Sequence, residues 1–146
     1  MEIARTPRGL LLRALRSVLP LDGALADGRA LPPDLVILVP TLRCNLHCPY
    51  CFQRDDSGLA WQPQDQDELK LHEWLAVVAD LRRLGPHVIV LGGELFLYRD
   101  ALKLLRAVKE AGLPLTIITN GIALPRVAGE LLEIGLDRLI VSLDGP

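Results

Sequence analysis

The stretch of sequence that decides the fold is GPHVIVLGGE, residues 85–94. Gly85 and Pro86 form a strong stop signal for a preceding helix, because glycine adopts the left-handed conformation at helix ends and proline cannot continue a helix. The apolar run His87–Leu91 predicts a short strand. Gly92, Gly93 and Glu94 then begin a loop. A helix end, a strand and a glycine-rich loop therefore follow one another within ten residues.

The same pattern lies on the N-terminal side of this stretch. Leu35–Val39 is a continuous apolar run, which predicts a strand buried on both faces. After a polar loop, Asp67 is positioned to cap a helix that runs to Leu84. One face of that helix carries an apolar stripe at helical spacing, made of Leu71, Trp74, Leu75, Val78 and Leu81.

The pattern also continues on the C-terminal side. A second helix is predicted from Asp100 to Gly112, with Leu104, Leu105 and Val108 pointing inward. The later elements are a strand at Leu115–Thr119, a helix at Leu124–Ile134 and a strand at Arg138–Leu143. This alternation predicts an α/β fold with about four parallel βα units, either doubly wound or curled into a barrel. Both architectures place the working surface at the carboxyl ends of the strands.

The composition is that of one soluble globular domain, with 146 residues, 50% of them apolar, and a net charge of −2. The sequence contains no basic tract that would predict nucleic-acid binding. It also contains no uninterrupted run of about 18 apolar residues that would predict a transmembrane segment. All three cysteines fall at Cys44, Cys48 and Cys51. Such a cluster is not a secreted disulfide framework and indicates metal or redox chemistry in a reducing compartment, the cytoplasm.

The N-terminal segment, residues 1–33, is expected to be an amphipathic helix followed by a linker. Arginines interrupt its leucines, so no signal-peptide core is present. The helix is expected to pack on the domain or on a partner, with a membrane-surface helix as the alternative. Residues 34–146 then form the second and larger domain.

Polar and glycine residues follow every predicted strand. A C-x3-C-x2-C motif, with Tyr50 just before its last cysteine, follows the first strand. Gly-Gly-Glu at 92–94 follows the second, Thr-Asn-Gly at 119–121 ends the third, and Ser-Leu-Asp-Gly at 142–145 ends the fourth. Together, the four motifs place the candidate site at one end of the sheet.

The order and spacing of these four motifs resemble the radical S-adenosylmethionine (SAM) enzymes, over residues 35–146. The resemblance implies a partial (β/α) TIM-type barrel in which Cys44, Cys48 and Cys51 hold a 4Fe-4S cluster whose fourth iron binds SAM. It further implies reductive cleavage of SAM to a 5′-deoxyadenosyl radical that abstracts hydrogen from a substrate. An electron donor such as flavodoxin or ferredoxin is expected. The motif wording is similar to the peptide and sulfatase maturase and cofactor-biosynthesis branch, which suggests a peptide or protein substrate.

The resemblance also assigns roles to other residues. Gly92 and Gly93 would let the backbone approach the methionine part of SAM, and Glu94 would accept a hydrogen bond from its ammonium group or shape the site. Side chains expected to contact the rest of SAM or to line the mouth of the site are those of Tyr50, Thr119, Asn120, Ser142 and Asp144. Leu95 and Phe96 stand where the family commonly has a proline after Gly-Gly-Glu.

Three other interpretations stay open at this point. Cys48-Pro49-Tyr50-Cys51 is also the dithiol motif of glutaredoxins. The three cysteines with His47 could form a tetrahedral zinc site. The chain could also be a non-catalytic fragment or subunit, since a complete barrel needs roughly 200 residues or more and this sequence stops after its fourth strand. An in-frame continuation with further βα units would show that this is the front of a longer enzyme.

Overall fold

The computed structural model describes residues 32–49, 51 and 68–143. The chain divides between Asp34 and Leu35 into two units, and the fold below is that of the second. The predicted N-terminal helix lies outside the described residues, as do Tyr50, Asp67 and Asp144.

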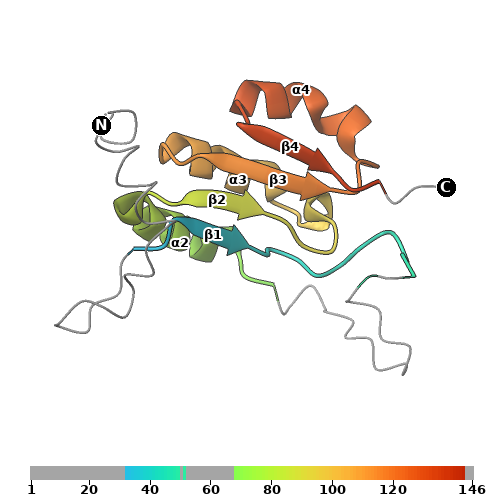
Figure 1. Ribbon diagram of the computed structural model, residues 1–146, viewed down its shortest axis with the longest axis horizontal. Helices are drawn as coiled ribbons and strands as arrows, with labels where there is room; N and C mark the ends of the chain where they lie inside the picture. Colours follow the sequence, from blue (N-terminus) through green and yellow to red (C-terminus); the bar gives the residue numbers. More distant parts are fainter. Residues whose placement is uncertain (1–31, 50, 52–67, 144–146) are drawn as a thin grey trace, which may run out of the picture. The chain divides into compact units, whose positions relative to one another are not determined.

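Four parallel strands form the sheet of the second unit: β1 (Leu35–Leu38), β2 (His87–Val90), β3 (Leu115–Thr119) and β4 (Arg138–Val141). Their order in the sheet is β1-β2-β3-β4, and their arrowheads point the same way in Figure 1. The strands are short and apolar, as the sequence predicts, and a parallel arrangement requires a crossover between each pair. The predicted α/β class with a parallel sheet is confirmed.

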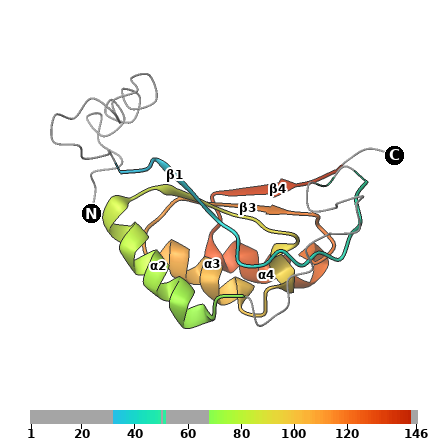
Figure 2. The ribbon, with the colours of Figure 1, turned by 90° about the horizontal axis from the view of Figure 1, so that it is seen from below.

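The crossovers are α2 (Leu71–Leu84), α3 (Ala101–Glu110) and α4 (Leu124–Ile134), with a single 3-10 turn, η4 (Leu95–Leu97), between β2 and α3. All three α-helices lie on the same face of the sheet (Figure 2). A doubly wound fold would reverse the strand order and place helices on both faces. In this sheet the strand order follows the chain order, and the helices cover one face. This is the arrangement of a segment of a (β/α) barrel.

The helix ends agree with the sequence at their C-termini and differ at one N-terminus. Gly85 and Gly135 adopt the left-handed conformation, with φ of 69° and 72°, and cap α2 and α4. The expected start of α2 at Asp67 is wrong, because the helix begins at Leu71. The Lys70 backbone N–H donates to the Glu73 carboxylate at 2.7 Å, and this contact satisfies a free amide at the actual start.

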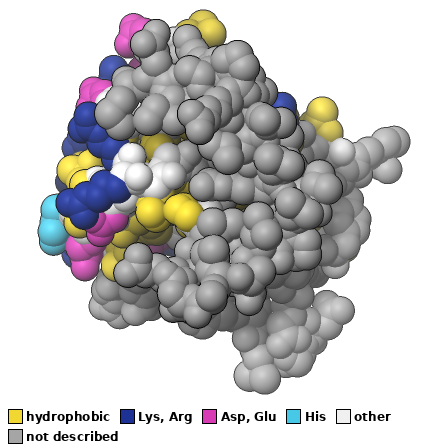
Figure 3. Space-filling view, turned by 60° about the vertical axis from the view of Figure 1, so that its left-hand side comes forward, with side chains coloured by type: hydrophobic (Ala, Val, Ile, Leu, Met, Phe, Trp, Pro, Cys, Tyr) yellow, Lys and Arg dark blue, Asp and Glu magenta, His cyan; other side chains and the backbone are white. Residues whose placement is uncertain are grey.

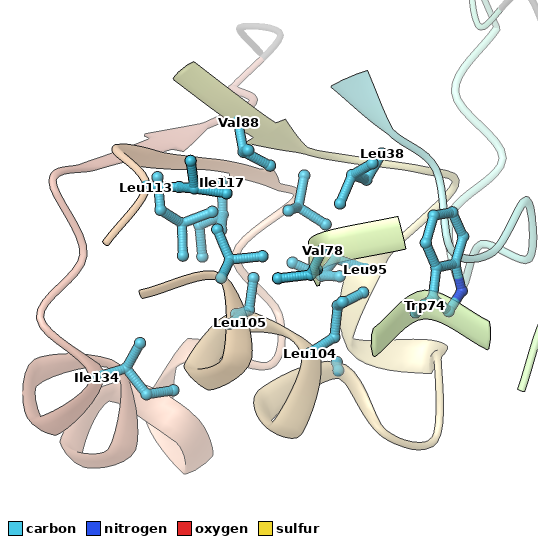
Figure 4. Close-up of a cluster of buried hydrophobic side chains, with 14 of the residues drawn as sticks. Leu38, Trp74, Val78, Val88, Leu95, Leu104, Leu105, Leu113, Ile117 and Ile134 are labelled. Carbon is cyan, nitrogen blue, oxygen red and sulfur yellow. The ribbon is translucent and has the colours of Figure 1, made fainter. Parts of the chain in front are cut away.

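The core lies between the sheet and the three helices (Figure 4). Leu104, Leu105 and Val108 of α3 are fully buried, as predicted. The predicted stripe on α2 is narrower than expected, because Leu75 is 41% exposed. The buried residues of that helix are Trp74, Val78 and Leu81.

The prediction that the first strand is buried on both faces is wrong. Leu38 is buried, whereas Leu35 and Ile37 are 49% and 52% exposed. The reason is the arrangement of the helices. They cover one face of the sheet, and alternate side chains of β1 point to the other face.

The described surface seen in Figure 3 carries cationic and anionic side chains side by side, with hydrophobic side chains between them. Within the described residues, no helix combines the length and apolar character needed to cross a membrane.

Candidate active site

The candidate site is built from loops that leave the carboxyl ends of the four strands. Because the strands are parallel, these ends meet at one edge of the sheet. The segment that carries the cysteines leaves β1 there, and residues 92–94 leave β2 (Figure 1). Thr119 is the last residue of β3, and Ser142 follows β4, with its backbone N–H donating to the Thr119 carbonyl at 2.9 Å. The structure therefore brings the described residues of the four motifs to the same edge.

The segment leading to the cysteines is docked directly on the Gly-Gly-Glu loop. The Gly93 N–H donates to the Thr41 carbonyl at 3.0 Å, and the Glu94 N–H donates to the Arg43 carbonyl at 2.7 Å. A Cβ atom at Gly92 would lie 2.2 Å from the Thr41 carbonyl oxygen, and one at Gly93 would lie 2.3 Å from that of Arg43. Both clashes are with backbone, which cannot move aside cheaply. These glycines are therefore required for the two loops to meet.

Glu94 is a buried carboxylate, 1% exposed, that ties the end of β2 to the end of β3. The Thr119 hydroxyl lies 2.8 Å from Oε1 and 3.0 Å from Oε2, and the Asn120 N–H donates to Oε2 at 2.8 Å. The Phe96 N–H donates to Oε1 at 3.2 Å. Buried charge needs such donors. The carboxylate thus has protein partners, and a direct contact with SAM stays a prediction.

Asn120 connects this network to the middle of the cysteine segment. Its Nδ2 donates to Asn45 Oδ1 at 2.8 Å, and its Oδ1 accepts from the Ile122 N–H at 3.1 Å. The second contact orients the amide, so that its nitrogen faces Asn45. Three loops, from β1, β2 and β3, are therefore linked by one chain of hydrogen bonds through Glu94 and Asn120.

The three cysteines are half-buried free thiols. The Leu46 N–H donates to Cys44 Sγ at 3.4 Å, and the Cys51 N–H donates to the Cys48 carbonyl at 3.2 Å, which forms a turn. Among the described residues, no three Cys, His, Asp or Glu side chains are grouped closely enough to hold a single metal ion. A cubane cluster takes one thiolate per iron, so its ligands need not converge on one point. Three free thiols on one short segment fit that donor set.

Sequence reasoning missed several residues that hold this segment. Three of these residues lie close to the first cysteine in the sequence: Thr41, Arg43 and Asn45. That closeness was the one signal in the sequence that could have indicated their role. Glu68 pairs with Arg43 from 25 positions away. No pattern in the sequence indicates that contact.

Residues 38–146 match the model of the radical SAM superfamily. The chain belongs to this superfamily. It is 39% identical over 114 residues to the GTP 3′,8-cyclase of Limosilactobacillus fermentum, covering 76% of this chain and 33% of that protein. It is 34% identical over 128 residues to the PqqA peptide cyclase of Rhizobium meliloti, covering 86% of this chain and 33% of that protein.

A solved structure, Streptococcus suis SuiB bound to the precursor peptide SuiA, has the same fold with a TM-score of 0.61 at 22% identity. The match covers 92% of this chain and 28% of SuiB. The predicted family, which is an enzyme family, and the predicted fold are therefore confirmed. The chain spans about a third of the length of the curated relatives named above, at 33% each.

Proposed function

We propose that this chain carries the cluster-binding and SAM-binding part of a radical SAM enzyme. Cys44, Cys48 and Cys51 would hold the 4Fe-4S cluster, leaving one iron for SAM. When bound, the cluster supplies the electron that splits SAM into methionine and a 5′-deoxyadenosyl radical, which abstracts hydrogen from the substrate. The observation that carries the proposal is the docking of the cysteine segment on Gly92 and Gly93, because it joins the loop proposed to hold the cluster to the loop proposed to hold SAM.

The chain's own groups would then position SAM. The backbone at Gly92 and Gly93 would lie against its methionine part, and Glu94 would shape that loop through its bonds to Thr119 and Asn120. Ser142 is exposed at the end of β4, where its hydroxyl is available for the ribose. Tyr50 and Asp144 are proposed to contribute at the adenine and at the substrate side.

For the substrate we propose a peptide or protein. One relative is named a peptide cyclase, and SuiB was crystallised with a precursor peptide. Other relatives are named GTP cyclases, so GTP is the alternative to test. A flavodoxin or ferredoxin is the proposed electron donor. The proposed compartment is the cytoplasm, because a cluster held by thiolates needs reduced cysteines.

The test is anaerobic reconstitution of the full chain with iron and sulfide, followed by SAM and dithionite. We expect a 4Fe-4S absorption and electron paramagnetic resonance signal, and 5′-deoxyadenosine detected by mass spectrometry. Each single Cys→Ser variant at 44, 48 or 51 should lose the cluster and the product. A cluster that forms without any cleavage of SAM would refute the enzyme proposal for this chain. Consumption of GTP added to the same mixture would overturn the peptide assignment.

Two control variants separate the competing interpretations. His47→Ala should leave iron and sulfide content unchanged, whereas a zinc site with this histidine would lose metal. Cys44→Ala should abolish the cluster. If this variant instead showed glutathione-dependent thiol-disulfide exchange at the wild-type rate, the dithiol interpretation based on Cys48 and Cys51 would replace the present one.

A further inference from the structure

The side chain of Arg43, the residue directly before the first cysteine, contacts residues far away in the sequence. Its Nε lies 2.8 Å from Glu68 Oε1, and its Nη2 lies 3.0 Å from Glu68 Oε2. The same Nη2 donates to the Leu97 carbonyl in η4 at 2.6 Å. The guanidinium therefore contacts two elements, the residues leading into α2 and the 3-10 turn after β2.

Glu68 is the centre of this cluster of contacts. Its carboxylate is bound in bidentate fashion by Arg43, and it also accepts a hydrogen bond from the buried Thr41 hydroxyl. The Thr41 oxygen in turn accepts from the Arg43 backbone N–H at 3.0 Å. The side chain of Glu68 is 10% exposed and that of Arg43 is 29% exposed. Partial burial and bidentate geometry make this pair stronger than a surface ion pair.

The position of Glu68 is itself held from the neighbouring residue. The Tyr98 hydroxyl donates to the Leu69 carbonyl at 3.0 Å, and Tyr98 is 5% exposed. Burial raises the pKa of the Tyr98 phenol, and the negative charges of Asp100, Glu68 and Glu73 raise it further. The phenol therefore keeps its proton, and with it the hydrogen bond, across the ordinary pH range.

Residues 41–43 are thus held on two sides. Their backbone rests on Gly93 and Glu94, and the Arg43 side chain is held by Glu68 and Leu97. Beyond Arg43, the contact of Asn45 with Asn120 is exposed to solvent. The direction in which the chain enters Cys44 is therefore set before the first cysteine.

We propose that Arg43 and Glu68 are positioning residues for Cys44: their ion pair fixes the backbone entering the cysteine segment, so that the first thiol is oriented before the cluster is loaded. The proposal rests on the proposed function for its purpose, but its geometry exists in the chain without the cluster. Neither residue belongs to the four motifs.

The test uses the cluster-free full chain under reducing, anaerobic conditions. Alkylation of each cysteine by iodoacetamide is followed by mass spectrometry in the wild type, in Arg43→Met, in Glu68→Gln and in the double variant. We expect the rate at Cys44 to rise about threefold in all three variants, because the segment opens more often. The rate at Cys51, whose turn does not involve the pair, should stay constant and serve as the internal reference.

The double variant separates positioning from simple destabilisation. A single variant leaves one partly buried charge without its oppositely charged partner, so its thermal midpoint should fall, whereas removing both charges should restore part of the midpoint. The alkylation rate at Cys44 should stay raised in the double variant even where the thermal midpoint recovers. If the rate at Cys44 returned to the wild-type value together with the midpoint, or never changed, the positioning role would be refuted. The exposed pair Asp80 and Arg83 in α2 supplies the matched control, since Asp80→Asn should alter neither measurement.

Reconstitution then separates this proposal from the proposed function. We expect the variants to bind less iron than the wild type and to give a broadened electron paramagnetic resonance signal. If the wild type itself bound no cluster, the proposed function would fail while the contrast in alkylation could still stand. If wild type and variants held identical clusters and reacted identically with iodoacetamide, the positioning role alone would fail.

Discussion

The two ends of the sheet carry different kinds of polar contact. At the carboxyl end, Glu94 is fully buried, and its hydrogen bonds join loops from different strands. At the amino end, Asp137 is about half exposed, at 46%, and accepts hydrogen bonds from Lys109 Nζ at 2.6 Å and the Leu115 N–H at 2.7 Å. The amino-end contacts join α3 and the start of β3 to the residue before β4. The carboxyl-end contacts position loops whose shape no helix or strand would otherwise determine.

The largest expected effect comes from Gly93, where an added Cβ would meet three backbone atoms of residues 42 and 43. Gly93→Ala would place a Cβ 2.3 Å from the Arg43 carbonyl oxygen, so the cysteine segment should separate from its support. We expect a loss of about 3 kcal/mol in the free energy of unfolding, measured by urea denaturation, and loss of reconstituted iron. The control is Gly129→Ala in α4, where nothing lies within 4 Å of the added atom. That change should stabilise the chain by about 0.5–1 kcal/mol.

The second prediction concerns the buried carboxylate. Glu94→Gln replaces one accepting oxygen by an N–H donor, which then faces the Thr119 hydroxyl or the Asn120 or Phe96 N–H. The unfolding free energy should fall by about 2 kcal/mol. Glu133→Gln on the exposed face of α4 should change it by less than about 0.5 kcal/mol. Equal effects of the two substitutions would contradict the tie between β2 and β3.

A smaller effect is expected at the exposed contact between Asn45 and Asn120. A double-mutant cycle with Asn45→Ala and Asn120→Ala isolates the pair from the other contacts of Asn120. The coupling energy should be about 0.5–1 kcal/mol, as for a neutral hydrogen bond. A coupling energy of zero would contradict a stabilising contact between the cysteine segment and the end of β3.

The smallest effect is expected at the amino end and depends on pH. Burial raises the pKa of Asp137, but the Lys109 hydrogen bond, the Leu115 amide and the charges of Lys109 and His87 outweigh it and hold the pKa below its usual value of 3.8. The ionised carboxylate therefore stabilises the fold above pH 3.8, and this contribution is lost as the pH falls through the folded pKa.

Asp137→Asn tests this directly. Its unfolding free energy should be slightly below that of the wild type at neutral pH and should converge with it in acid, as measured by urea denaturation at a series of pH values. Its reconstituted iron content should equal that of the wild type. A loss of iron in this variant would break the distinction between the two ends of the sheet.

Local features were predictable because local physics decides them. Gly85 and Gly135 end helices through their own backbone freedom, and the apolar runs of β2 and β3 match the structure closely. The start of α2 was not predictable from Asp67, since a contact between Lys70 and Glu73 sets it. The exposed face of β1 was also missed, because the sequence does not say how many faces of the sheet the helices cover.

The sequence by itself determined the α/β class, the cysteine segment and the placement of polar motifs after each strand, since periodicity and chain order are properties of the sequence. Only the tertiary structure decided what the motifs do to one another. It showed that the glycines at 92 and 93 admit the backbone of residues 41–43, and that Glu68 holds Arg43. Such contacts join residues far apart in the chain, and their distances depend on how the strands pair and how the loops between them pack.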